Sequence, residues 1–168
     1  MRDIVILGST GSIGVQALEV IAANPTKFRV VGLSAGSNNL ERLAEQAKKF
    51  SLPIVGTTGD PSKLKALLPG VEVIDGPNSS RQIASLSCDV VLNGITGSIG
   101  LGPTLAALEV GNKVALANKE SLVAGGDLVM AHGRDRIIPV DSEHSALFQA
   151  MSAGKLSDVE KVILTASG

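Results

Sequence analysis

The chain has 168 residues, of which 44% are hydrophobic, enough for one domain with a buried core or for one domain and the start of another. Its 15 lysines and arginines nearly balance its 16 aspartates and glutamates, and tryptophan and tyrosine are absent, so we expect no nucleic-acid partner. The single cysteine, Cys88, cannot form an internal disulfide, and its apolar surroundings predict a small buried side chain. No stretch has the pattern of a signal peptide or the length of a membrane span, so we expect a cytoplasmic protein without membrane contact.

Short runs rich in β-branched residues alternate with longer segments of helical period along the chain. The predicted strands cover residues 4–7, 30–33, 54–55, 71–74, 89–92, 114–117, 137–140 and 162–165. The predicted helices cover residues 13–23, 40–50, 61–68, 79–86, 103–110, 119–131 and 143–153. Apolar strands without strict alternation are typical of parallel sheets that are covered on both faces. The pattern predicts an α/β fold with a doubly wound, mainly parallel Rossmann-type sheet and helices on both faces.

A glycine-rich turn, GSTGSIG at residues 8–14, follows the first predicted strand and begins the first predicted helix. Glycines there allow a tight turn and let backbone N–H groups approach a pyrophosphate, whose charge the helix N-terminus favours. The spacing is G-x-x-G-x-x-G, and many strand-to-helix turns carry glycine for packing alone. In this position we favour dinucleotide binding.

A second turn, NGITGSIG at residues 93–100, repeats the first one after the strand at 89–92. In a doubly wound sheet the strands that begin the two halves lie side by side. Both turns would then face one crevice, although two unrelated turns with similar needs would give the same pattern.

The end of the second predicted strand indicates which dinucleotide is bound. An NAD site usually has an acidic residue there for the ribose 2′-hydroxyl, but residues 32–39 read GLSAGSNN and the first acid is Glu41. Hydroxyls, amides, backbone N–H groups and Arg42 could instead accept a 2′-phosphate, which favours NADP. Alternatively, this is only a polar loop in which Asn39 caps the next helix.

Three further motifs follow later strands at the same expected edge. Asp141 and Glu143 are two residues apart, and on extended chain both carboxylates would reach one hard divalent cation such as Mg²⁺ or Mn²⁺. The alternative is that they cap the next helix and complement its dipole. Lys119 could hold a substrate anion or be a solvated lysine at a helix start, and Ser167 follows the last predicted strand.

Four motifs together resemble the 1-deoxy-D-xylulose 5-phosphate reductoisomerase family: GSTGSIG at 8–14, LANKESL at 116–122, PVDSEH at 139–144 and LTASG at 164–168. They occur in that family's order and cover the whole chain. The resemblance implies an NADPH-dependent, metal-assisted isomerisation and reduction of 1-deoxy-D-xylulose 5-phosphate to 2-C-methyl-D-erythritol 4-phosphate, in the non-mevalonate route to isoprenoids. It also implies a phosphorylated sugar substrate and a homodimer for the full-length protein.

Residue roles follow from the same resemblance. The residues implied to contact NADPH are Thr10, Gly11, Ser12, Ile13, Gly36, Asn38, Asn118 and Glu120. Asp141 and Glu143 would bind Mg²⁺ or Mn²⁺, and the residues implied around the substrate are Lys119, Ser142, Glu143 and Ser167, with Lys119 and Glu143 as catalytic residues. Ser37 stands where relatives often have a basic residue, which affects the grip on the 2′-phosphate.

The resemblance also sets the expected domains and their limits. Residues 1–140 would form the NADPH-binding domain and residues 141–168 the start of the catalytic domain. The family continues beyond the equivalent of Gly168 with a third acidic metal ligand and a substrate-phosphate site, so we expect these 168 residues alone to bind cofactor without turnover. Two alternatives are another NADP dehydrogenase of the homoserine or semialdehyde type and a non-catalytic nucleotide-binding module.

Overall fold

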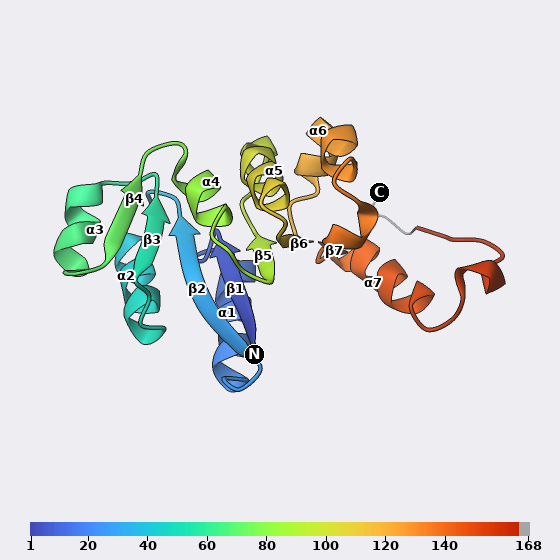
Figure 1. Cartoon of the computed structure of the whole chain (residues 1–168), viewed down its shortest axis with the longest axis horizontal. Coiled ribbons are helices and arrows are strands. Elements are labelled where there is room, and N and C mark those ends of the chain that lie inside the picture. Colours follow the sequence, from blue (N-terminus) through green and yellow to red (C-terminus); the bar gives the residue numbers. More distant parts are fainter. Residues whose placement is uncertain (165–168) are drawn as a thin grey trace.

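A computed structural model describes residues 1–164 and contains one sheet of seven parallel strands (Figure 1). The strands are β1 (Arg2–Leu7), β2 (Phe28–Ala35), β3 (Ile54–Thr57), β4 (Glu72–Asp75), β5 (Val90–Asn93), β6 (Lys113–Leu116) and β7 (Ile137–Pro139). Their order in the sheet is β4-β3-β2-β1-β5-β6-β7. The chain winds outward from β1 to one edge, then crosses to β5 and winds to the other. The doubly wound α/β fold expected from the sequence is confirmed.

The predicted strand at residues 162–165 is wrong over the part that the structure describes. Residues 162–164 have no regular secondary structure, and Ile163 is 67% exposed. A strand needs a hydrogen-bonded neighbour, and this segment lies apart from the sheet, beyond its β7 edge (Figure 1). The other predicted strands agree with β1–β7 to within about two residues at each end, as is usual for such boundaries.

Helices cover both faces of the sheet. They are α1 (Ser12–Ala23), α2 (Leu40–Lys49), α3 (Pro61–Leu67), α4 (Ser79–Ala84), α5 (Leu101–Glu109), α6 (Glu120–Met130) and α7 (Ser142–Met151). One core cluster joins α1, α2 and α3 to the sheet, and a second joins α4, α5 and α6 to the opposite face. Successive residues of β1 serve both clusters: Ile4 and Ile6 face the first, Val5 and Leu7 the second. The apolar runs in the sequence therefore reflect a sheet that is buried on both sides.

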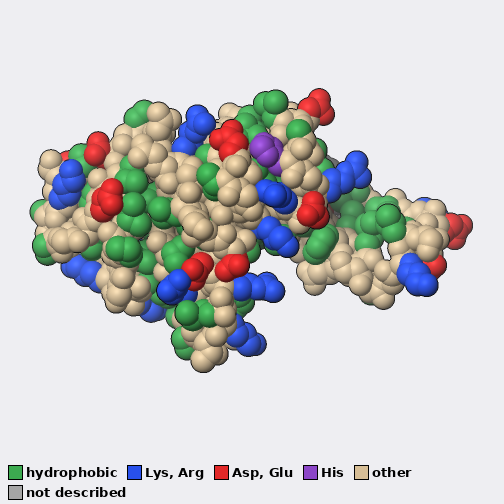
Figure 2. Space-filling view, in the orientation of Figure 1, with side chains coloured by type: hydrophobic (Ala, Val, Ile, Leu, Met, Phe, Trp, Pro, Cys, Tyr) green, Lys and Arg blue, Asp and Glu red, His purple; other side chains and the backbone are tan. Residues whose placement is uncertain are grey.

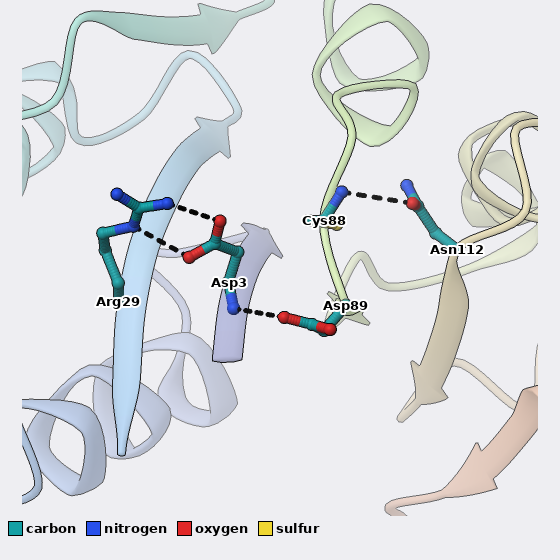
Figure 3. Close-up of polar contacts among 5 residues, drawn as sticks. All are labelled: Asp3, Arg29, Cys88, Asp89 and Asn112. Carbon is teal, nitrogen blue, oxygen red and sulfur yellow. Dashed lines mark hydrogen bonds and ion pairs between the residues drawn. The ribbon is translucent and has the colours of Figure 1, made fainter. Parts of the chain in front are cut away.

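Polar contacts join neighbouring strands at the amino edge of the sheet (Figure 3). The Arg29 guanidinium on β2 donates two hydrogen bonds to the Asp3 carboxylate on β1, at 2.8 and 2.6 Å. These bonds are the main reason that the pKa of Asp3 lies below its usual value. The backbone N–H of Asp3 also donates to the Asp89 carboxylate at 2.7 Å, which connects β1 to the residue before β5.

Cys88 lies beside this edge, and the buried side chain expected from the sequence is only partly buried. Its backbone N–H donates to the Asn112 side chain at 3.3 Å (Figure 3), and its side chain packs against the second core cluster. Burial raises the pKa of the Cys88 thiol to about 11. The thiol is therefore protonated at neutral pH.

The last helix differs from the others because none of its residues is buried. Figure 1 shows α7 at the β7 edge of the sheet, with the following segment reaching away from the domain. Between α1 and Val140, the first face of the sheet carries an apolar groove of about 440 Å³. None of the described helices is long and apolar enough to cross a membrane.

Candidate functional site

The first glycine-rich turn connects β1 to α1 at the carboxyl edge of the sheet. Gly8 has a φ of 74°, a left-handed conformation that favours glycine, and its N–H donates to the Ser34 carbonyl on β2 at 2.9 Å. Ser9 is fully buried and exchanges hydrogen bonds with Gln46 of α2 at 2.8 and 2.9 Å. Gly11 occupies the N-cap position of α1 and has no side chain with which to cap it. The first N–H groups of α1 are thus available to an anion.

The second turn lies directly against the first. A Cβ placed on Gly8 would be 2.9 Å from the Gly94 carbonyl oxygen, and the Gly94 N–H donates to the Leu7 carbonyl at 3.0 Å. The two backbones approach this closely because β1 and β5 are neighbours in the sheet. The prediction that both turns face one crevice at the switch point is confirmed.

Two buried amides hold the second turn in shape. Asn93, at the end of β5, donates to the Gly100 carbonyl at 2.9 Å and to the Thr104 hydroxyl at 2.8 Å, and its oxygen accepts from the Ile95 N–H at 3.1 Å. Asn93 is fully buried, so these bonds satisfy an amide that has no access to water. The amide fixes both ends of the turn at once.

Asn118 follows β6 and holds the same turn from the other side. Its side-chain N–H₂ donates to the carbonyls of Ile95 and Gly97, and its oxygen accepts from the N–H and hydroxyl of Ser121, each at 2.8 Å. Asn118 is 2% exposed, and these four bonds use its full donor and acceptor capacity. The implied contact between Asn118 and NADPH stays a prediction, while its contact with the turn is structural.

A cleft of about 680 Å³ opens above the two turns, between the end of β2 and the starts of α4 and α5. Three of the predicted cofactor residues line it: Gly11, Gly36 and Asn38. The backbone of Gly94 and the side chains of Ile95 and Ile99 form the wall contributed by the second turn. The volume suits a ligand of the size of a nucleotide.

The other predicted cofactor residues do not line the cleft. Thr10 is partly buried within the first turn, whereas Ser12 and Ile13 are exposed at the start of α1. Glu120 is exposed at the first position of α6. Arg42, in the first turn of α2, lines a separate groove between α1 and α2. Gly36 and Asn38 of the loop after β2 therefore line the cleft, and Arg42 does not.

The cleft also contains a residue that the motifs do not indicate. Arg81 on α4 is the one charged side chain among the described residues that line it. No glycine pattern or strand end marks Arg81, because it comes from the helix that crosses between the two halves of the sheet. Only the fold places it opposite the end of β2.

The predicted substrate and metal residues gather at the carboxyl ends of β6 and β7. Lys119, Asp141 and His144 line one small cavity there. The helix α7 begins at Ser142, so Glu143 lies in its first turn and the expectation that both carboxylates stand on extended chain is wrong. Asp141 occupies the N-cap position, where extended backbone turns into helix. Ser167 lies outside the described residues.

Hydrogen bonds already engage both carboxylates. The Asp141 carboxylate is 2.7 Å from the His144 ring nitrogen Nδ1, and the Ser142 hydroxyl donates to Glu143 at 2.8 Å. The Ser142 bond is the main reason that the pKa of Glu143 lies below its usual value, with a smaller contribution from the positive charge of Lys119. The Glu143 carboxylate is thus favoured in the charged form that a metal requires.

The type of ligand in this site suits a hard divalent cation, but the number of ligands is too small. Two carboxylates supply the oxygen ligands that Mg²⁺ and Mn²⁺ prefer. Within residues 1–164 no group of three acidic, histidine or cysteine side chains is placed to hold a metal ion. Further oxygens would have to come from a substrate, from water or from outside the described part of the chain.

Charge is evenly distributed over the face shown in Figure 2, where acidic and basic side chains are interspersed.

The two glycine-rich turns at the switch point and the cleft above them define the class of this chain: a Rossmann-type α/β domain of the dinucleotide-binding kind. Family models then identify it more closely. The model described as 1-deoxy-D-xylulose 5-phosphate reductoisomerase matches residues 4–126, and that of the family's C-terminal domain matches residues 137–168. The chain belongs to the 1-deoxy-D-xylulose 5-phosphate reductoisomerase family.

Individual relatives agree with this assignment. The chain is 53% identical over 175 residues to the reductoisomerase of Beutenbergia cavernae and 55% identical over 169 residues to that of Leifsonia xyli subsp. xyli. These alignments cover 99% and 100% of this chain but 44% and 42% of the relatives. The chain therefore spans less than half the length of the curated relatives that it matches.

Solved structures show the same relationship. The reductoisomerase from Zymomonas mobilis in complex with NADPH superposes with a TM-score of 0.81 at 40% identity, covering 88% of this chain and 41% of that one. A reductoisomerase in complex with NADPH, fosmidomycin and magnesium gives 0.79 at 33% identity, covering 91% and 40%. A homoserine dehydrogenase from Thiobacillus denitrificans, at 18% identity and a TM-score of 0.51, shares the fold alone.

Proposed function

We propose that this chain provides the NADPH-binding part of a reductoisomerase that converts 1-deoxy-D-xylulose 5-phosphate to 2-C-methyl-D-erythritol 4-phosphate. The observation that carries the proposal is the pair of glycine-rich turns in contact at the switch point, in a chain that belongs to this family. Relatives of known structure were solved with NADPH and with magnesium, which supports the same ligands here. When bound, NADPH would supply hydride and the cation would polarise oxygens of the substrate.

Different residues of this chain would contact different parts of the cofactor. Gly11 and the free N–H groups of α1 would hold the pyrophosphate, while Gly36 and Asn38 would meet the ribose and its 2′-phosphate. Thr10, Ser12 and Ile13 would complete the phosphate turn, and Glu120 and the turn positioned by Asn118 would lie toward the nicotinamide.

Substrate chemistry would take place at the ends of β6 and β7. Asp141 and Glu143 would hold Mg²⁺ or Mn²⁺, and Lys119 would neutralise negative charge on the sugar phosphate substrate beside Ser142. We extend the proposal to Ser167 as a substrate contact, to residues 1–140 and 141–168 as the cofactor domain and the start of the catalytic domain, and to a cytoplasmic homodimer as the working form.

Titration calorimetry with NADPH and NADH tests the cofactor assignment. We expect NADPH to bind more tightly, because the end of β2 has no acidic side chain to repel a 2′-phosphate. Equal affinities, or tighter binding of NADH, would contradict it.

An NADPH-oxidation assay with 1-deoxy-D-xylulose 5-phosphate and Mg²⁺ tests the division between binding and catalysis. We expect residues 1–168 alone to give no turnover, since two carboxylates hold a hard cation weakly. Turnover that disappears in Asp141→Asn would show that the metal site is complete within this chain.

A further inference from the structure

The cationic side chain in the cleft has no partner among the residues that the structure describes. Arg81 lines the cleft and is exposed to solvent. Its guanidinium makes neither an ion pair nor a hydrogen bond with any residue in 1–164. Elsewhere in this part of the chain, Arg29 is paired with Asp3 and Lys63 with Glu41. The Arg81 guanidinium is therefore free to meet a ligand without first breaking a contact.

Its position is fixed by the packing of α4. The hydroxyls of Ser80 and Ser34 lie 3.0 Å apart, which anchors the neighbouring residue of α4 to β2. The aliphatic stem of Arg81 lies along α5: a Cβ placed on Gly102 would be 3.4 Å from Arg81 Cδ and 3.7 Å from Cγ. With the stem supported in this way, the guanidinium lies at the rim of the cleft between α4 and α5.

The rest of this part of the cleft is suited to a flat apolar group. Its walls include Ala35, Pro77, Ile99 and Pro103. Within residues 1–164, no aromatic side chain lines the cleft. The chain has neither tryptophan nor tyrosine, and its three phenylalanines lie elsewhere. Phe28 lines the groove on the sheet face, Phe50 lines the groove between α1 and α2, and Phe148 is on α7. For a nucleotide base bound here, the Arg81 guanidinium is the one planar cation among the described lining residues on which the base could stack.

We propose that Arg81 stacks its guanidinium on the adenine base of the bound dinucleotide. This inference rests on the proposed function, because it assumes that the cleft takes NADPH. Arginine is suited to this role because its planar, weakly hydrated guanidinium can lie flat on a π system, whereas the ammonium of lysine is compact, strongly hydrated and not planar. The contact adds affinity for the adenosine half and does not distinguish NADPH from NADH.

The test compares Arg81→Ala, Arg81→Lys and the wild-type chain in calorimetric titrations with NADPH, NADH and 5′-AMP. Arg2→Ala is the matched control, because Arg2 is exposed at the start of β1, at the amino edge of the sheet and opposite to the edge that carries the cleft. We expect Arg81→Ala to weaken all three ligands by a similar factor, about tenfold. Arg81→Lys should recover little of this loss, and Arg2→Ala should bind as the wild type does.

Several outcomes would overturn the inference. Unchanged affinity in Arg81→Ala would show that the side chain makes no contact with the ligand. A loss for NADPH alone that Arg81→Lys restores would show that Arg81 meets the 2′-phosphate as a charge. If the wild-type chain and Arg81→Ala bind NADPH with the same affinity, only the inference fails, whereas a wild-type chain that binds no dinucleotide overturns the proposed function as well.

Discussion

Exchanging two glycines of the first turn should separate stability from cofactor binding. A Cβ placed on Gly14 would be 2.5 Å from the Gly8 carbonyl oxygen and 2.5 Å from the Ser9 Cα. Non-bonded heavy atoms pack at about 3.5 Å, so Gly14→Ala forces α1 and the turn apart by about 1 Å. Both neighbouring atoms belong to the backbone, so neither can turn away by changing a side-chain rotamer.

The size of the effect follows from two opposing contributions. Overpacking costs about 1–3 kcal/mol, and we take about 3 kcal/mol because only backbone is available to move. Alanine inside a helix stabilises by about 1 kcal/mol relative to glycine, which leaves a net loss of about 2 kcal/mol. For a domain of this size that loss lowers Tm by about 4–8 °C.

Gly11 provides the matched substitution. A Cβ there meets only the Gly8 carbonyl oxygen, at 3.3 Å, and its extended φ of −77° and ψ of 171° accept a β-branched side chain. Because Gly11 lines the cleft, Gly11→Val should abolish NADPH binding while costing no more than about 1 kcal/mol as a poorer N-cap. Thermal unfolding by circular dichroism and NADPH titration measure the two effects. Unchanged Tm in Gly14→Ala, or wild-type affinity in a folded Gly11→Val, would refute this reasoning.

Three further predictions concern polar groups outside the first turn. Asn118→Asp replaces the side-chain amide donor with an oxygen that faces two backbone carbonyls. Urea titration at pH 7 should therefore show a free energy of unfolding that is lower by about 3 kcal/mol. A decrease below about 1 kcal/mol would contradict the contacts described. The pKa of Asp3 is lowered in the folded state, so its contribution to stability is present above the unfolded pKa and disappears as pH falls through the folded one. Asp3→Asn should therefore be less stable than wild type at pH 7, and the difference should shrink as pH falls below the unfolded pKa of Asp3; a difference that does not change with pH would be inconsistent with the Arg29 ion pair. With a pKa of about 11, Cys88 should react with iodoacetamide at pH 8 much more slowly than free cysteine, and equal rates would show that the thiol is not shielded.

The positions of the strands and helices could be predicted because each depends on local pattern. Strands that are buried on both faces give continuous apolar runs, and β1 shows this directly, with alternate residues in different core clusters. The segment at residues 162–164 has the same composition, yet it is not a strand, because pairing depends on a neighbour that local sequence cannot supply.

The candidate site could be predicted where its residues follow strands of a parallel sheet. All such strands end at one edge, so the two glycine-rich turns, Lys119 and Asp141 had to gather there once the doubly wound order was assumed. The helix α7 begins at Ser142, one residue earlier than predicted. Glu143 therefore lies on a helical turn rather than on extended chain.

By itself, the sequence determined the fold class, the edge of the sheet that carries the site and the family to which the chain belongs. Tertiary structure alone decided which polar groups are free to meet a ligand. The Asn118 amide is used up by the second turn, because β6 brings it beside that turn. Arg42, which the sequence indicated as a possible ligand of the 2′-phosphate, lines the groove between α1 and α2, whereas Arg81, which no motif marks, lines the cleft. The reason is physical: the availability of a side chain depends on what packs around it, and those neighbours come from distant parts of the chain.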